Sequence, residues 1–277
     1  MKTGAVALDL LREAAARRWF LALGLALTAL LLLLVTSLRL EVVDGALAAT
    51  RLFGKPIFHD IRPADVALRP VFLVASQMVF WCGLCFGVLA CADFAPALLS
   101  PGRIEHLLSL PVQRWELLLG TFVGVLTLAA GGAAYASGGL ILVLGAKTGV
   151  WTGWPLISAL LSALSFGGVY AGMLAVAVWV RSAALSAAAG ASLIGLGLLA
   201  TYRRTLLDVM GEGLGRALFA GVTALVPPLG KLADAAGALA SSAPLAPGGV
   251  LRLILGTLAF AGGLLALAAW RFERRDF

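Results

Sequence analysis

The sequence predicts an all-α, polytopic membrane protein with six transmembrane helices. Of its 277 residues, 61% are hydrophobic and only 13% are charged, whereas soluble domains carry roughly 25% charged residues. Apolar runs of about 20 residues recur along the chain, and each is long enough to cross a hydrocarbon core of roughly 30 Å. The alternating strands of about ten residues that build a membrane β-barrel are not visible in the sequence. The helical class therefore follows from composition and run length.

Tryptophan residues mark many ends of the apolar runs, as expected for side chains that favour the headgroup region of a bilayer. These residues are Trp19, Trp115, Trp151, Trp154, Trp179 and Trp270. No composition change or low-complexity linker divides the chain, so residues 1–277 are expected to form one domain. The predicted spans are 20–38, 70–95, 116–145, 154–180, 182–202 and 249–270.

Residues 1–19 are expected to form an interfacial helix in front of the first span. At 100° per residue, apolar and charged side chains separate onto opposite faces, which is typical of a helix that lies flat on a membrane. The apolar face holds Leu8, Leu11, Ala15 and Trp19, and the polar face holds Asp9, Arg12, Glu13 and Arg17. Arg17 and Arg18 also resemble a twin-arginine export signal. Because no small-residue cleavage site follows, we interpret the first span as a retained anchor.

The two longer loops differ in character. Residues 39–69 are polar and suggest a small cap. Residues 203–248 contain amphipathic stretches at Leu206–Val226 and Leu232–Ala240, separated by Pro227-Pro228. These stretches are too short to cross comfortably, which predicts re-entrant or interfacial helices. If Leu214–Val226 did cross, the C-terminus would lie on the opposite side.

Basic residues divide almost evenly between the two sides of this topology. Dense basic clusters flank the first and last spans at the two chain ends, and most of the opposing charges lie in long loops, which influence orientation less. We therefore expect both termini to be cytoplasmic. The net charge of +7 suits anionic lipid headgroups, because the basic residues gather at span ends. They form no basic stripe with interleaved aromatic residues, so nucleic acid is not an expected partner.

The chain has no visible catalytic or energy-converting motif of its own. The span interiors are almost free of charge, apart from Asp93 near one end of the second span, which disfavours an ion-coupled carrier. The sequence has no phosphate-binding loop and no hydrolase signature. His59 and His106 lie in different loops. We therefore expect neither enzymatic activity nor a cofactor bound by this chain.

Cysteines and glycines in the spans are best explained by packing. Cys82 and Cys85 share a helix face, whereas Cys91 lies about 180° from Cys82. One helix therefore cannot supply three thiolates, although a dimer could pair cysteines into a copper(I) site. The Gly120-x-x-x-Gly124 spacing permits close approach of two helices. That contact could lie within one subunit or between subunits.

A short polar segment, residues 102–114, separates the second and third spans. Pro101-Gly102 ends the preceding helix, Arg103–Leu110 can form a new one, and Pro111 ends that helix in turn. The segment is either a solvated connecting loop or a rigid helix that docks into a soluble motor protein.

The motif in this segment resembles the signature of ABC type-2 transporter permeases. It reads Gly102-x-x-Glu105-x-Leu107-Leu108-x-x-Pro111-Val112-x-Arg114, followed by Leu117-Leu118-Leu119-Gly120. The ending Arg271–Phe277, the amphipathic start, the six spans and the dipping helices are also similar to that family. Permeases encoded near nitrous-oxide-reductase maturation genes are among the members that the chain resembles. It departs from the family at Arg103, where threonine is frequent, and at Thr121, where lysine is frequent.

The resemblance implies a membrane subunit of an ABC exporter in the bacterial cytoplasmic membrane. A cytoplasmic ABC ATP-binding subunit would bind ATP and Mg, and a second permease copy would complete a homodimer, with a periplasmic partner left open. Residues 102–114 would be the coupling helix, 1–19 the connecting helix, and 203–248 the external helices. The residues implied in coupling are Gly102, Arg103, Glu105, His106, Leu107, Leu108, Pro111 and Arg114, with Arg12, Glu13, Arg17 and Arg18 in the connecting helix.

Two other functions remain open at this point. A non-transporting membrane anchor could use the same coupling helix to recruit an ATPase that performs mechanical work on an external partner. A secondary carrier would instead require ion-gradient-dependent uptake without ATP.

Glu105 and Arg114 are the residues expected to set the geometry of the coupling helix and its contact with the motor. We predict that Arg114→Glu leaves membrane insertion intact but uncouples transport from ATP hydrolysis, because it reverses a charge at the motor contact. Parallel transport and ATPase assays test this prediction. Unchanged transport in the variant would contradict it.

Overall fold

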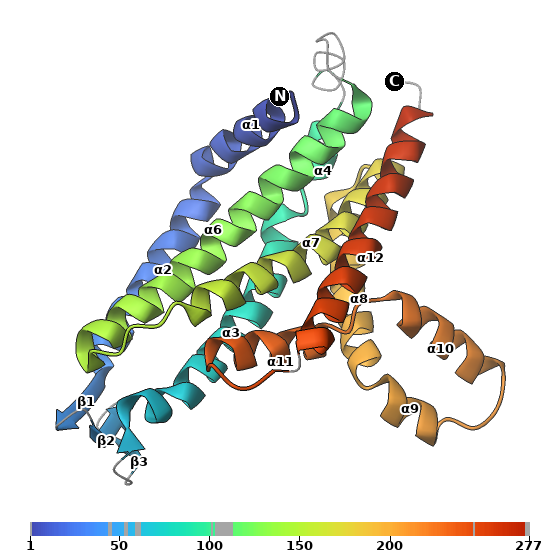
Figure 1. Ribbon diagram of the computed structural model, residues 1–277. Coiled ribbons are helices and arrows are strands. Elements are labelled where there is room, and N and C mark those ends of the chain that lie inside the picture. Colours follow the sequence, from blue (N-terminus) through green and yellow to red (C-terminus); the bar gives the residue numbers. More distant parts are fainter. Residues whose placement is uncertain are drawn as a thin grey trace.

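Long apolar helices that run between two ends of the molecule dominate the computed structural model (Figure 1). The structure describes residues 2–43, 46–52, 55–58, 62–100, 102, 113–245 and 247–274. Five helical stretches are long and apolar enough to cross a membrane: Val66–Leu98, Arg114–Thr148, Trp154–Val180, Ala183–Thr201 and Gly248–Glu273. The pair Thr3–Ala16 and Phe20–Thr36 passes the same test together but bends by 68°. The prediction of a multi-pass helical membrane protein is confirmed.

The elements follow one another in an up-and-down order, and both ends of the chain lie at the same end of the bundle (Figure 1). We call this the terminal side. The helices are α1 (Lys2–Ala16), α2 (Arg18–Ser37), α3 (Ala64–Cys91), α4 (Phe94–Leu98), α6 (Arg114–Thr148), α7 (Trp154–Val180), α8 (Ala183–Thr201), α9 (Arg203–Val209), α10 (Leu214–Leu225), α11 (Leu229–Ala240) and α12 (Pro247–Glu273).

Local sequence explains where the helices end. Gly149 adopts a left-handed φ of 74° and its N–H donates to the Gly145 carbonyl at 2.8 Å, which ends α6. The connection between α7 and α8 is only Arg181 and Ser182. Arg181 is also left-handed, and the Ser182 hydroxyl accepts from the Leu185 N–H, which starts α8.

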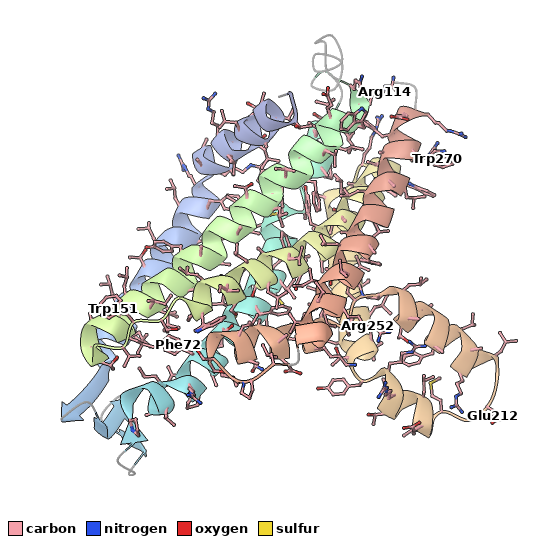
Figure 2. All side chains as sticks on the ribbon, in the orientation of Figure 1. Phe72, Arg114, Trp151, Glu212, Arg252 and Trp270 are labelled. Atoms are coloured by element: carbon pink, nitrogen blue, oxygen red, sulfur yellow. The ribbon has the colours of Figure 1, made fainter. Side chains whose placement is uncertain are left out.

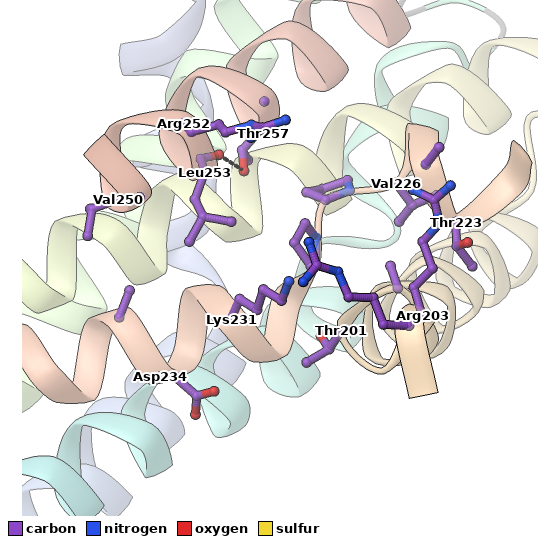
Figure 3. A pocket seen from close by; sticks show the side chains of 18 of the residues that line it. Thr201, Arg203, Thr223, Val226, Lys231, Asp234, Val250, Arg252, Leu253 and Thr257 are labelled. Carbon is purple, nitrogen blue, oxygen red and sulfur yellow. Dashed lines mark hydrogen bonds between the residues drawn. The ribbon is translucent and has the colours of Figure 1, made fainter. Parts of the chain in front are cut away.

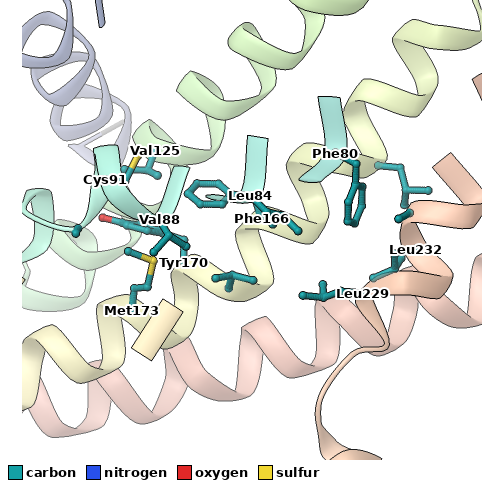
Figure 4. Close-up of a cluster of buried hydrophobic side chains, with 14 of the residues drawn as sticks. Phe80, Leu84, Val88, Cys91, Val125, Phe166, Tyr170, Met173, Leu229 and Leu232 are labelled. Carbon is teal, nitrogen blue, oxygen red and sulfur yellow. The ribbon is translucent and has the colours of Figure 1, made fainter. Parts of the chain in front are cut away.

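Helix α7 lies at the centre of the bundle, and 78% of its apolar stretch is buried. It packs against α3, α4, α6, α8, α11 and α12. Its small residues allow this approach: a Cβ atom on Gly168 would lie 3.2 Å from the Thr257 methyl, and one on Gly167 would lie 3.1 Å from Leu126. Figure 4 shows the apolar core around α7. It includes Phe80, Leu84, Val88, Val125, Phe166, Tyr170, Met173, Leu229 and Leu232.

Gly120 and Gly124 on α6 pack against helix α1 of the same chain. A Cβ on Gly120 would lie 2.5 Å from the Val6 Cβ, and one on Gly124 would lie 3.2 Å from the Ala7 Cα. The buried side of α1 is formed by Ala7, Leu10 and Ala14. Leu8, on the face predicted to lie against the membrane, is 49% exposed. The contact with α6 was not predicted, and it is possible because glycines on α6 let the backbone of α1 approach closely.

The segment predicted as a polar cap contains a small antiparallel sheet, which corrects the all-α expectation at this point. Its strands are β1 (Leu38–Val43), β2 (Ala46–Leu52), β3 (Lys55–Phe58) and β4 (Arg62–Pro63). β2 pairs with each of the others. The run Leu38-Arg39-Leu40-Glu41-Val42 alternates apolar and charged residues, the period of a strand. His59 and Asp60 of the predicted cap lie outside the described residues.

The predicted external segment forms three short helices, α9, α10 and α11. Pro227-Pro228 separates α10 from α11, as predicted, and Val226 before them is extended. Helix α11 packs back on the bundle through Leu229, Leu232 and Ala236, all buried. Helix α10 has 12 residues, or about 18 Å, which is too short to cross a bilayer. The chain enters and leaves this segment at the same end of the bundle (Figure 1).

The contact between α1 and α6 predicts a position-dependent effect of a bulky residue. Gly120→Leu is expected to lower the apparent midpoint of thermal unfolding in detergent by the equivalent of about 1–3 kcal/mol, because it overlaps Val6. The matched control is Gly131→Leu on the same helix, where a Cβ meets nothing within 4 Å. Equal effects at the two positions would contradict the observed packing of α1.

Candidate functional site

The predicted coupling segment connects α4 to α6 on the terminal side of the bundle. Its two outer residues, Gly102 and Arg114, are described. The other residues assigned to coupling (Arg103, Glu105, His106, Leu107, Leu108 and Pro111) lie outside the described residues. The site is therefore built here from the elements that hold the two ends of the segment.

A buried apolar cluster, which we call the terminal-side cluster, holds both ends together. The incoming end contributes Leu98 and Leu99, which are 6% and 1% exposed, and the outgoing end contributes Leu117 and Leu118. Burial of leucine side chains stabilises such a contact by about 1.5–3 kcal/mol each. The complete cluster is Ala95, Leu98, Leu99, Leu117, Leu118, Leu174, Ala175, Ala177, Val178, Ala268 and Phe272.

Gly102 marks the point at which the chain leaves this cluster. Its φ of +82° lies in the left-handed region, where glycine has no steric penalty. The backbone can therefore turn sharply three residues after the cap of α4 at Leu99. The sequence-based prediction of a helix break at this position is confirmed for Gly102.

The outgoing end is fixed by the first turn of α6. The Glu116 carboxylate accepts a hydrogen bond from the Gln113 N–H at 2.9 Å, and the Trp115 indole N–H donates to the Gln113 side-chain oxygen. The hydrogen bond to Glu116 satisfies the Gln113 N–H, a backbone donor that the start of the helix leaves without a partner. The pair was not singled out in the sequence, although a Gln-x-x-Glu spacing before an apolar run is a recognisable signal for a helix start.

Arg114 joins the start of α6 to the end of α12. Its Nη1 donates to the carbonyl oxygens of Phe272 at 3.3 Å and Glu273 at 3.2 Å. A cation is favourable there, because the last carbonyls of a helix carry partial negative charge. Phe272 itself is fully buried in the terminal-side cluster. The effect expected for Arg114→Glu therefore includes loss of this link to α12, in addition to any contact with a partner.

A second polar link joins the N-terminal helix to the incoming end. Arg17 lies at the bend between α1 and α2 and donates to Glu13 at 2.7 Å and to Asp93. Its guanidinium lies 4.4 Å from the ring centre of Phe94, which stacks on Phe20. Asp93 precedes the first residue of α4, in the break between α3 and α4. The link therefore connects the bend of α1–α2 with the break of α3–α4, directly before the coupling segment.

The pKa of Arg17 is raised above its ordinary value. Partial burial by itself lowers this pKa. The guanidinium also donates hydrogen bonds to Glu13 and Asp93 and is attracted by their negative charges, and these effects together outweigh burial. Arg17 thus stays charged in the link.

The four residues predicted in the connecting helix divide into two pairs. Arg12 and Arg18 are exposed, as predicted for a polar face. Glu13 and Arg17 are half-buried, and Arg17 pairs with both Glu13 and Asp93. The contact between Arg17 and Asp93 leaves no signal in the sequence, because the two residues are 76 positions apart.

The bundle interior offers few groups for chemistry. Cys82 and Cys85 are exposed and Cys91 is buried. Within the described ranges, no group of three His, Cys, Asp or Glu side chains could hold a metal ion. The Tyr170 hydroxyl is buried and has no hydrogen-bond partner among the described residues, while its ring stacks on Phe122 and Phe166. His59 and His106 are outside the described residues.

Comparison of the sequence with known protein families and with curated proteins found no match.

The link between Arg17 and Asp93 predicts coupled effects in a double-mutant cycle. Arg17→Gln and Asp93→Asn are each expected to lower the apparent stability in detergent by roughly 1 kcal/mol, since both side chains are partly exposed to solvent. The double variant should be hardly less stable than either single variant. Arg18→Gln, an exposed neighbour, serves as control and should leave stability unchanged. Simple additivity of the two single effects would rule out the link.

Proposed function

We propose that this chain is the transmembrane permease subunit of an ATP-driven ABC type-2 transporter, acting as an exporter. A separate cytoplasmic ABC subunit binds and hydrolyses ATP with Mg, and the segment 102–114 receives its motion. The main observation in support is that the residues on both sides of this segment pack in the terminal-side cluster. The motif within the segment, from Gly102 to Arg114, adds support from the sequence.

The contacts around the segment explain how a push on it reaches the spans. Leu98 and Leu99 precede it, Leu117 and Leu118 follow it, and all four pack in the terminal-side cluster with residues of α7 and α12. Close-packed interiors transmit displacement because they contain few voids. Arg114 passes the same displacement to the end of α12. The link from Arg17 to Asp93 extends it to α1 and α2.

The proposed assembly places this chain in the bacterial cytoplasmic membrane with both termini cytoplasmic. The segment 102–114 then faces the ATP-binding subunit, and a second copy of the chain completes a homodimer. Helices α9, α10 and α11 lie at the opposite end, where they face the exit and any periplasmic partner. In this arrangement the α1 surface that carries Arg12 and Arg18 faces anionic headgroups or the partner.

A second candidate function is a non-transporting anchor that passes mechanical work to an external partner. The packing of α7 supports it, because fully buried Tyr170, Met173 and Leu174 fill the centre of the described bundle. In this version, ATP hydrolysis moves the external helices without moving cargo through the membrane.

Charge reversal at two ends of the molecule tests the proposed partner contact. We expect the tagged chain, purified from its native membrane in mild detergent, to bring a stoichiometric soluble ATPase with it. Glu105→Arg should lose most of this ATPase, because the substitution reverses a charge within the docking segment. The matched control is Glu212→Arg, since Glu212 is exposed on the opposite side of the molecule (Figure 2).

Two results would count against the proposal. One is recovery of the wild-type chain without an ATPase, and the other is equal loss of the ATPase in both variants. If the ATPase is present but vesicles show no ATP-dependent movement of any cargo, the mechanical anchor becomes the better description.

A further inference from the structure

A large pocket lies at the end of the bundle opposite the terminal side, among α8, α9, α10, α11 and α12 (Figure 3). Its volume is about 1150 Å³. It is bounded by the end of α8 at Thr201, by the Pro227-Pro228 connection, and by the first turns of α12. The pocket therefore occupies the depth at which spanning helices begin and end. Headgroups of a bilayer lie at this depth.

The charge of the pocket is strongly positive. Its lining includes four basic residues, Arg203, Arg204, Lys231 and Arg252, and the acidic residue Asp234. Asp234 accepts a hydrogen bond from the Gln77 side chain at 3.4 Å. Within the part of the chain that the structure describes, none of the four basic residues forms an ion pair. The lining thus holds an excess of positive charge without a counterion from the protein.

Two of the basic side chains converge. Figure 3 shows Lys231 and Arg203 directed toward the same part of the pocket, whereas Asp234 points away from it. The Nε atom of Arg203 is buried and has no hydrogen-bond partner among the described residues. Converging like charges and an unsatisfied buried donor are both costly. An anion with several acceptor oxygens would relieve both costs.

The remaining wall of the pocket is apolar. It includes Leu225, Val226, Pro227, Val250 and Leu253. A free inorganic anion would leave this wall in contact with water and would fill little of the volume. An occupant with an anionic head and an apolar body satisfies both parts of the lining.

Exposed leucines continue this apolar wall along α10. Leu225 lines the pocket, and Leu214 and Leu218, which share a helix face with it, are 79% and 62% exposed. This leucine face of α10 offers a path for acyl chains that run from the charged pocket along an apolar helix surface.

We propose that this pocket binds the phosphodiester headgroup of an anionic phospholipid, whose acyl chains lie along the leucine face of α10. Arg203 and Lys231 bind the phosphate oxygens, with Arg252 at the rim. The lipid joins α9 and α10 to α11 and α12, which are otherwise connected across the pocket by few contacts. The site does not depend on the proposed function, because it involves only the membrane and the end of the bundle away from the ATPase segment.

Lipid competition on the full-length protein tests the site. The chain is reconstituted in nanodiscs of mixed phosphatidylglycerol and phosphatidylcholine, extracted, and its retained lipids are quantified by native mass spectrometry. We expect retained phosphatidylglycerol to exceed its share of the bilayer. Arg203→Gln/Lys231→Gln should reduce this enrichment about tenfold, because two cation–phosphate contacts are lost. The matched control Arg271→Gln/Arg274→Gln removes two exposed cations from the terminal side and should retain the enrichment.

Two further measurements distinguish a bound phospholipid from a free anion and from loss of the folded pocket. Arg203→Lys/Lys231→Arg keeps both charges and should keep the enrichment, which shows that the pocket is still formed. Inorganic phosphate, added during extraction, should not displace the lipid. Equal retention of the two lipids by the wild-type protein, or unchanged enrichment in the glutamine variant, would overturn the proposal. Displacement of the lipid by inorganic phosphate would overturn it as well, in favour of a free anion site.

Discussion

The burial of α7 is the constraint on which the rest of the structure depends. This helix contacts α3, α4, α6, α8, α11 and α12, and its glycines allow backbones to approach where larger side chains would overlap. The same helix contributes Leu174 and Val178 to the terminal-side cluster and Tyr170 and Met173 to the central core. Movement of either end of the bundle therefore meets one shared, closely packed element. Helix α7 therefore connects the terminal side of the bundle with its central core.

Two polar links complete this arrangement on the terminal side. Arg114 binds the last carbonyls of α12, and Arg17 binds Asp93 beside α4. Both are placed where a coupling segment would need rigid ends, since a loose end would absorb displacement instead of passing it on. The opposite end is built differently. There, α9 and α10 project from the bundle around a positively charged pocket (Figure 1), and the proposed lipid supplies part of the cohesion.

Hydropathy predicted the helical spans well, because lipid and core both demand long apolar runs. The predicted span 154–180 coincides with α7. The second span was expected to begin at Pro70, yet α3 begins at Ala64, since buried Leu68 and Phe72 hold the turn around the proline. The sheet at 38–63 and the inner face of α1 were missed. Their signals, a short alternation and a face of two alanines and one leucine, are weaker than a long apolar run. The contact of Arg17 with Asp93 could not be predicted, because only tertiary packing brings them together.

In the proposed transporter, the segment 102–114 moves with the spans when the partner binds nucleotide. This motion can be measured as the distance between spin labels at position 106 and at Val222 on α10, in a variant whose three cysteines are replaced by serine. The complex with the ATPase is measured with and without a non-hydrolysable ATP analogue. We expect nucleotide binding to shift the distance distribution. Identical distributions in the two states would contradict it.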